Sequence, residues 1–434
     1  MASQSDSDTP VPPGLVLRPF RALRYARDGA ELAAVTSPPY DVVDDRELAE
    51  LLARDPRNVI RLTLPQDGDD GTSRYELAAR QLAQWRSDGS LVRDPESALY
   101  VYEEAAGHHV QRGLVGAVAL ARADAQIVLP HEDTMAGPVS DRLALSEATK
   151  ANLEPIFLVY AGGGAASQFV ASMDERQPLI DATTDDGIRH RIWAITDRDE
   201  LAAVAADLLP RRATIADGHH RYANYLRYQQ DRRANGGGAG PWDFGLALLV
   251  DTNAFGPEVH PIHRVIPSLP AAQAAKLAAT AFRVTPTPAR GQALLDELAK
   301  AGEDGPAFAL ADAAKAWLLT NPDPSQALRA LPADRSPAWR SLDVSLAHYL
   351  LIRQVWSLQD TVDVVGFRHD LDSTLKAAGS NGTALLLNPT PVQGVAAVAE
   401  AGDRMPRKST LFMPKPRTGL LIRLLDAMDL DTQD

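Results

Sequence analysis

Residues 212–228 read RATIADGHHRYANYLRY, and the fold of the chain is best understood from this stretch outward. Ala213 to Ala216 is a short apolar run with β-branched members, which predicts a buried strand. The tyrosines and the leucine that follow recur at helical spacing, which predicts a helix. The stretch therefore predicts a strand and a helix joined by the turn Asp217-Gly218-His219-His220-Arg221.

The turn brings a carboxylate, a glycine, two imidazoles and a guanidinium to the start of one helix. N–H groups at a helix N-terminus carry partial positive charge and favour phosphate. Gly218 lets the backbone approach a ligand closely, and Arg221 can fork onto phosphate oxygens. Asp217 can hold a metal ion or accept a hydroxyl proton. The structural alternative makes Asp217 a plain N-cap and Arg221 its helix partner, with the histidines as polar surface.

The composition is that of a soluble globular protein, with 45% hydrophobic and 23% charged residues. Its 434 residues exceed one ordinary core, so several domains are expected. A net charge of −13 argues against nucleic acid or an anionic membrane as a partner. The lack of cysteine excludes disulfides, a thiol nucleophile and thiolate metal sites. We find neither a long apolar run nor a secretory signal, and we expect a cytoplasmic protein.

A second cluster of potentially catalytic side chains lies at Pro130-His131-Glu132-Asp133-Thr134, after a predicted strand at 114–121. A carboxylate, an imidazole and a hydroxyl fall within four residues there. Glu132 can act as a general base or a metal ligand, and the alternative is a capping cluster before the helix that ends near Lys150.

Two further loops carry polar groups that suit a binding site. Ser37-Pro38-Pro39-Tyr40-Asp41 is an extended loop fixed by its prolines, and it is either a substrate-binding loop or a plain helix entry. The run 405–420 is basic within an acidic chain and contains Lys408 and Lys415. It is either a solvated hairpin or an anion-binding loop that returns to the central turn.

We expect a mixed α+β fold, in which a central core is elaborated by N-terminal and C-terminal α+β segments. The predicted organisation is a disordered tail at 1–13, an N-terminal segment at 14–110, a nucleotide-binding core at 111–268, a small lobe at 269–335 and a C-terminal segment at 336–434. Within the N-terminal segment, Asn58 to Leu64 is predicted to be a strand.

Five motifs resemble the bacterial domain-of-unknown-function family 1015 over almost the whole chain. They are Ser37-Pro38-Pro39-Tyr40-Asp41-Val42, Pro130-His131-Glu132-Asp133-Thr134, Ala216-Asp217-Gly218-His219-His220-Arg221-Tyr222, His263-Arg264-Val265, and Lys408-Ser409-Thr410 through Pro414-Lys415. Together they are specific for the family, whose name implies no chemistry.

The central part, about 110–265, also resembles the ParB/sulfiredoxin-type fold, and especially the free-serine kinases within it. In those kinases an Asp-Gly-His-His-Arg turn binds nucleotide phosphates, and an upstream glutamate activates the substrate hydroxyl. The resemblance implies that Asp217 to Arg221 are the phosphate turn and that Glu132 is the glutamate. A long insertion between the two segments departs from the small kinase domain.

The sequence is therefore interpreted as a phosphotransferase that moves a phosphoryl group from ATP or ADP, with Mg²⁺, to a small hydroxyl compound such as serine or a serine-like amino acid. The catalytic candidates are Glu132, Asp217 and His220, and Asp217 is also the candidate metal ligand. The nucleotide-binding candidates are Gly218, His219, His220, Arg221, Lys408 and Lys415. The substrate-binding candidates are Tyr40, Asp41, His131 and Thr134.

Two other functions stay open on the sequence. A ParB-like fold also suits a nucleotide-binding regulatory protein without turnover, because fold alone does not decide function. A metal-dependent hydrolase is the third reading, built on His131, Glu132, Asp217, His219 and His220. The sequence does not determine the oligomeric state, and a homodimer is one arrangement it allows.

Overall fold

The structure, a computed structural model, describes residues 11–361 and 363–426. The chain forms two compact units, one from Met1–Pro257 with Pro414–Asp434 and one from Glu258–Met413. This division differs from the five predicted segments, because the strands on either side of the predicted boundary near residue 110 pair with each other inside one sheet. Most of the predicted tail, up to residue 10, lies outside the described residues.

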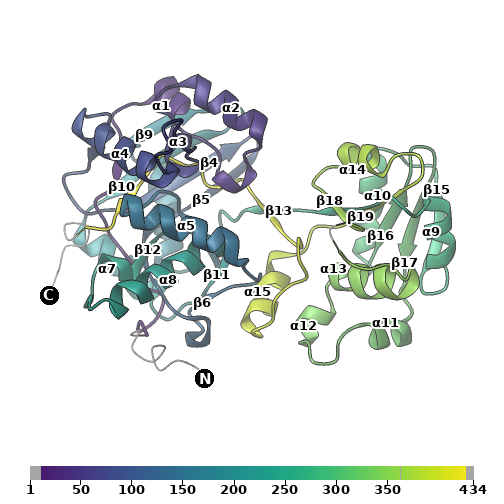
Figure 1. The fold of residues 1–434 in the computed structure, drawn as a ribbon. Coiled ribbons are helices and arrows are strands. Elements are labelled where there is room, and N and C mark those ends of the chain that lie inside the picture. Colours follow the sequence, from purple (N-terminus) through teal and green to yellow (C-terminus); the bar gives the residue numbers. More distant parts are fainter. Residues whose placement is uncertain (1–10, 362, 427–434) are drawn as a thin grey trace. The chain divides into compact units, whose positions relative to one another are not determined.

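The first unit is built on a mixed nine-stranded sheet (Figure 1). Its main path runs β6-β11-β8-β12-β5-β4-β10-β9, and β1 pairs with β5. The strands are β1 Leu17–Arg18, β4 Leu99–Ala106, β5 His109–Ala119, β6 Val128–Leu129, β8 Ile156–Tyr160, β9 Ile180–Thr183, β10 Arg189–Ile195, β11 Ala213–Asp217 and β12 Phe244–Asp251. Neighbours are antiparallel except β6 with β11 and β8 with β12, which are parallel.

Helices cover this sheet and bury its apolar side chains. Strand β8 lies between β11 and β12, and all five of its side chains are buried, which explains its unbroken apolar sequence. The helices are α1 Gly29–Val35, α2 Asp45–Arg54, α3 Ile60–Thr63, α4 Arg74–Ser87, α5 Ala136–Thr149, α6 Ala165–Ala171, α7 Arg198–Leu208 and α8 His219–Ala234. Helices α5 and α8 pack together, and their contact places the site described below (Figure 1).

The segment predicted as a strand at Asn58 to Leu64 is instead helical and contains α3. The side-chain oxygen of Asn58 accepts a hydrogen bond from the N–H of Ile60, while its Nδ2 donates to the carbonyls of Ala34 and Thr36. These bonds turn the chain at Asn58 and start the helix. The β-branched composition of the segment reflects its burial against α4 and not a place in a sheet.

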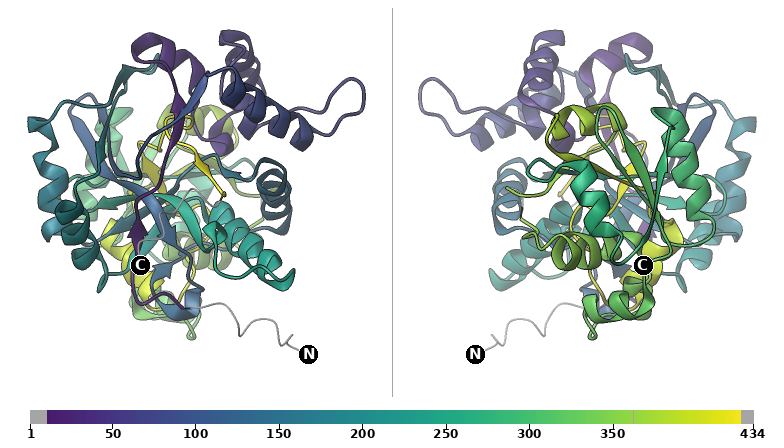
Figure 2. Two further views of the ribbon diagram at one scale, coloured as in Figure 1. Left: turned by 90° about the vertical axis from the view of Figure 1, so that its left-hand side faces the viewer. Right: turned by 90° about the vertical axis from the view of Figure 1, so that its right-hand side faces the viewer.

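The chain leaves the first unit after Pro257 and returns to it at Pro414, and the returning segment is yellow in Figures 1 and 2. Thr418 exchanges backbone hydrogen bonds with Ser37. Further on, β21 Arg423–Leu424 pairs with β7 Ala151–Asn152. The remaining small pair of this unit is β2 Leu23–Tyr25 with β3 Leu91–Arg93. The end of the chain is thus tied to its beginning and its middle.

The second unit has a six-stranded antiparallel sheet in the order β15-β17-β16-β19-β14-β18. Its strands are β14 His263–Ile266, β15 Arg283–Thr287, β16 Phe308–Ala311, β17 Ala316–Thr320, β18 Gly366–Arg368 and β19 Thr383–Leu387, and β13 Glu258–His260 pairs separately with β20 Leu411–Met413. Its helical segments are α9 Ala271–Ala278, α10 Gln292–Gly302, α11 Pro324–Ala330, α12 Pro337–Arg340, α13 Asp343–Leu346, the π-helical η6 Ala347–Val355, α14 Leu371–Ala378 and α15 Val392–Glu400.

The mixed α+β class predicted from the sequence is confirmed in both units. Within the described parts of the chain, no helix combines the length and the apolar character needed to cross a membrane.

Candidate functional site

The site lies where two neighbouring strands of the first unit end. Strands β6 and β11 are parallel, with Thr214 in register with Leu129. Their carboxyl ends therefore meet at the same edge of the sheet, which is where open α/β sheets commonly bind ligands. The loop that carries Glu132 follows β6, and the turn at Asp217 follows β11. Sequence reasoning did not detect β6, because a strand of two residues leaves almost no pattern.

Gly218 makes the sharp change from β11 to α8. Its φ of +91° is in the left-handed region, and it is the N-cap residue of the helix. A Cβ atom added there would lie 3.0 Å from Nε of Arg221. Glycine thus allows both the backbone conformation and the close approach of the guanidinium.

Replacing Gly218 with alanine is expected to lower the free energy of unfolding by about 1–2 kcal/mol, because an L-residue in the left-handed region is strained. Gly238, exposed and with open space around its added Cβ, is the matched control and should change by less than about 0.5 kcal/mol. Urea unfolding of both variants measures the difference. Equal losses in the two variants would show that the turn does not need glycine.

The two histidines of the turn hold the loop that carries Glu132. Nε2 of His219 accepts from the backbone N–H groups of His131 at 3.2 Å and Glu132 at 3.3 Å. Nε2 of His220 accepts from the N–H of Met135 at 3.1 Å. Nδ1 of His131 in turn lies 2.6 Å from the carbonyl oxygen of Ile215, to which it donates. The rings of His131 and His219 meet edge to face at 4.6 Å.

This geometry brings Glu132 to the N-terminus of α8, the convergence on which the sequence interpretation depended. The Glu132 side chain is 34% exposed and its Oε1 lies 3.9 Å from Nε2 of His131. The Nε2 atoms of both imidazoles accept hydrogen bonds from loop amides, and the assignment of His219 and His220 to nucleotide phosphate stays a prediction. Main-chain N–H groups and the helix dipole at the turn also suit an anion.

Asp217 lies in the site between two cations. Its Oδ2 accepts from Nη2 of Arg221 at 2.5 Å, and its Oδ1 accepts from Nζ of Lys415 at 2.7 Å. Burial favours the neutral acid, but the charges of Lys415 and Arg221 outweigh burial and hold the pKa of Asp217 below its ordinary value. Nζ of Lys415 also lies 3.4 Å from Oδ2 of Asp41. Burial lowers the pKa of Lys415, but the two carboxylates more than offset it and the net shift is upward.

Arg221 is buried and is part of the framework of the site. Its Nη1 donates to the carbonyl oxygen of Pro155 at 2.6 Å, and its Nη2 donates to Asp217. Although burial opposes the charge, Asp217 and Glu154 raise its pKa. The guanidinium of Arg221 thus binds the protein itself, and its assignment to nucleotide phosphate stays a prediction.

Sequence reasoning missed Glu154 and Arg142. Glu154 is buried, and its Oε1 accepts from the N–H of Tyr40 and from Oγ1 of Thr418, each at 3.0 Å. The guanidinium of Arg142 lies over the ring of Tyr40 at 4.2 Å. Burial raises the pKa of Tyr40 to about 12, so its phenol is neutral at physiological pH. The one signal that could have identified Glu154 is a charged residue two positions before the buried strand β8.

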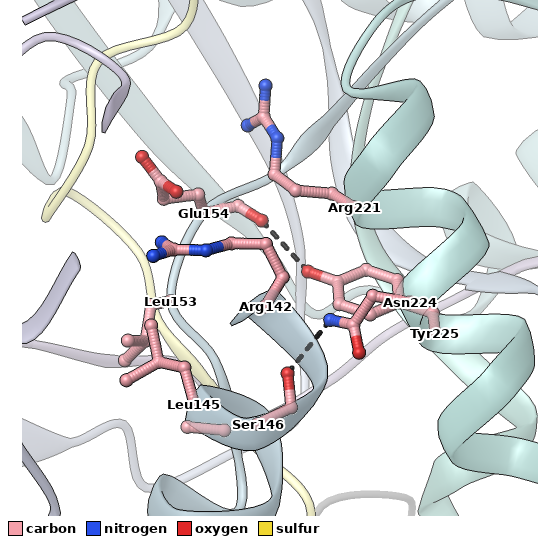
Figure 3. A pocket seen from close by; sticks show the side chains of 9 residues that line it. Arg142, Leu145, Ser146, Leu153, Glu154, Arg221, Asn224 and Tyr225 are labelled. Atoms are coloured by element: carbon pink, nitrogen blue, oxygen red, sulfur yellow. Dashed lines mark hydrogen bonds between the residues drawn. The ribbon is translucent and has the colours of Figure 1, made fainter. Parts of the chain in front are cut away.

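A small pocket lies beside these residues and is lined by side chains from α5, α8 and residues 151–154 (Figure 3). Its volume of about 20 Å³ is enough for one water molecule. Figure 3 shows the hydrogen bond from the Tyr225 hydroxyl to the Glu154 carbonyl and the one from Asn224 to Ser146. Among the described residues, Oδ1 of Asn224 is buried without a hydrogen-bond partner.

The other predicted site residues are placed as follows. Tyr40 and Asp41 begin the short helix η2 Tyr40–Val42, and Asp41 reaches Lys415. Thr134 is exposed in the loop after Glu132. Lys408 belongs to the second unit, where it is exposed and has a φ of +55°. Its assignment to the nucleotide stays a prediction.

Each carboxylate oxygen of Asp217 accepts a hydrogen bond from a cation, Arg221 or Lys415. The assignment of Asp217 as a metal ligand stays a prediction. Across residues 11–361 and 363–426, no three His, Asp or Glu side chains are grouped to hold a metal ion. The histidines of the hydrolase alternative join the loop to the turn and to β11.

Comparison with protein families matches residues 17–345 to the one described as protein of unknown function (DUF1015). Among curated proteins, none matches the chain. The family expected from the five motifs is therefore confirmed.

Several solved structures are similar to the chain at low identity. SbnI with a C-terminal truncation, from Staphylococcus aureus, is 11% identical, with 71% of this chain and 87% of that chain covered and a TM-score of 0.35. A free serine kinase variant in complex with ADP is 12% identical, with 74% and 92% covered and a TM-score of 0.33. A conserved hypothetical protein from Pyrococcus furiosus is 13% identical, with 70% and 91% covered and a TM-score of 0.30.

Proposed function

The chain belongs to the DUF1015 family, and we propose that it is a phosphotransferase that moves a phosphoryl group from a nucleotide to the hydroxyl of a small polar compound. Serine or a serine-like amino acid is the proposed acceptor, and ATP or ADP the donor. The observation that carries the proposal is the contact of His219 with the backbone of Glu132. It fixes a partly exposed carboxylate beside a helix N-terminus, so that a proton acceptor lies next to an anion-binding position.

In this proposal the nucleotide phosphates lie against the first turn of α8. Main-chain N–H groups at Gly218 and His219 supply hydrogen bonds, and the helix dipole adds partial positive charge. Lys415, whose side chain is 12% exposed, contacts Asp217 and supplies a full positive charge. Phosphoryl transfer requires mainly positioning and charge neutralisation, and in this proposal the helix N-terminus and Lys415 supply both.

The proposed step uses Glu132 as the base. The acceptor hydroxyl gives its proton to the Glu132 carboxylate while its oxygen forms a bond to the terminal phosphorus. The bond from that phosphorus to the bridging oxygen breaks, and the shortened nucleotide leaves with the electron pair. Mg²⁺ would arrive with the nucleotide, because each carboxylate oxygen of Asp217 already accepts a hydrogen bond from a cation.

We propose that Asp41 recognises an ammonium group of the acceptor. Its side chain is 34% exposed and only 3.4 Å from the single ammonium of Lys415, which it shares with Asp217. Because Asp41 is partly exposed and shares its ammonium partner with Asp217, its carboxylate can also attract a cationic group of the acceptor. The neutral phenol of Tyr40 and the hydroxyl of Thr134 are proposed to bind the polar parts of the same molecule.

The test is incubation of the purified chain with ATP or ADP, Mg²⁺ and a panel of hydroxy amino acids, with transfer of labelled phosphate as the readout. Calorimetry with ATP, ADP and CTP runs beside it. Transfer to at least one hydroxy amino acid is the expected result. Nucleotide binding with no transfer to any acceptor would favour the regulatory protein, and the absence of both would end the proposal.

A further inference from the structure

Glu154 links three segments that are distant in the sequence. Its Oε1 accepts from the N–H of Tyr40, on the loop that precedes Asp41, and from Oγ1 of Thr418, three residues after Lys415. Its backbone carbonyl accepts from the hydroxyl of Tyr225 on α8. The N-terminal loop, the returning C-terminal segment and the helix of the turn therefore meet at one residue, which Figure 3 shows beside Arg142 and Arg221.

The two segments bonded by the Glu154 side chain are the same two that bring charges to Asp217. Asp41 and Lys415 lie on them, and Lys415 contacts both aspartates. We propose that Glu154 is a positioning residue, whose carboxylate fixes Asp41 and Lys415 against Asp217 and so sets the charge that meets the ligand. The expected effect of Glu154 on catalysis rests on the proposed function, whereas its positioning of Asp41 and Lys415 does not.

The burial of Glu154 supports a specific role. Only 4% of the residue is exposed, and removing a carboxylate from water costs several kcal/mol unless it is well paired. Burial raises the pKa of Glu154, and the charges of Arg221 and Arg142 act in the opposite direction. A buried charge often adds little net stability to the fold. The presence of Glu154 in this site is therefore better explained by the positions that its carboxylate imposes on Tyr40 and Thr418.

Thr418 allows the contact to be tested with small changes. Thr418→Val removes the hydroxyl that donates to Glu154 and keeps the shape, whereas Thr418→Ser keeps the hydroxyl. Glu154→Gln keeps the size of the side chain and removes its charge. Glu147→Gln, at an exposed position on α5, is the matched control for loss of one carboxylate.

Hydrogen exchange and ATP calorimetry are measured on the full chain and all four variants. We expect amides at 40–42 and 415–418 to exchange at least about tenfold faster in Thr418→Val and Glu154→Gln, and ATP affinity to fall about tenfold. Thr418→Ser and Glu147→Gln should stay within about twofold of the unchanged chain. Where transfer is observed, its rate should fall at acid pH as Glu154 becomes neutral. Because the pKa of Glu154 is raised, this fall should begin above the ordinary glutamate pKa of about 4.3. The Glu154→Gln variant should lack this fall in rate.

Unchanged exchange at 40–42 and 415–418 in both Thr418→Val and Glu154→Gln would overturn the inference. A loss of unfolding free energy without faster exchange at these amides would show that Glu154 only supports the core. If the unchanged chain binds no ATP and transfers no phosphate, the proposed function fails, while the exchange results still decide whether Glu154 positions these segments.

Discussion

Replacing Glu132 with glutamine is expected to lower phosphoryl transfer by about 10²- to 10⁴-fold, the range that a general base contributes. Glutamine keeps the size of the side chain and cannot accept the proton of the acceptor hydroxyl. The backbone N–H of residue 132 still donates to His219, so the loop and the helix N-terminus stay in place. ATP affinity should therefore change by less than about threefold, and steady-state kinetics beside calorimetry measure both quantities.

Asp133→Asn is the control for this experiment, because Asp133 is the exposed carboxylate next to Glu132 on the same loop. It removes the same unit of charge at the mouth of the site, and transfer should fall by no more than about threefold. Equal losses in the two variants would mean that the loop contributes only its electrostatic field. Full activity of Glu132→Gln would exclude Glu132 as the base.

Replacing Arg221 with methionine is expected to destabilise the protein by about 3–5 kcal/mol, the usual consequence of breaking a buried ion pair. The change removes the hydrogen bonds to Asp217 and to the carbonyl of Pro155, and leaves Asp217 with Lys415 alone. Because Arg221 is buried, water cannot replace it without a rearrangement of the turn. Denaturant unfolding measures the loss.

Arg227→Met provides the comparison on the same helix. Its guanidinium pairs with Asp231 four residues on, but 61% of the side chain is exposed. Exposed pairs of this kind contribute about 0.3–0.5 kcal/mol, so this variant should be nearly as stable as the unchanged chain. A loss for Arg221→Met as small as that for Arg227→Met would mean that the guanidinium is free to turn toward a ligand, as the sequence first suggested.

Elements with a strong local pattern were predictable. The apolar run before Asp217 and the helical spacing after Gly218 correspond to β11 and α8. The failures occurred where tertiary contacts overrode local preference. Asn58 to Leu64 carries a strand-like composition, but hydrogen bonds from Asn58 to two distant carbonyls turn it into a helix start.

The sequence identified many of the residues that form the site, but it did not reveal which atoms each of them contacts. The turn and the Glu132 loop were identified because functional residue types crowd into a few positions of each. That the imidazoles hold loop amides, and that Arg221 holds Asp217 and Pro155, depends on which atoms lie within about 3 Å. Glu154 was missed because its partners are 114 and 264 residues away in the sequence.

The sequence by itself determined the family, the mixed α+β class and the short segments that carry chemistry, because these depend on residue type and local spacing. Only the tertiary structure decided that the loop after β6 and the turn after β11 lie at the same edge of the sheet. The reason is the parallel pairing of β6 with β11, and β6 is too short to be recognised in the sequence. The tertiary structure also decided that a lysine near the end of the chain neutralises Asp217. Long-range pairing is set by the summed burial and charge of the whole fold, which no local window of sequence contains.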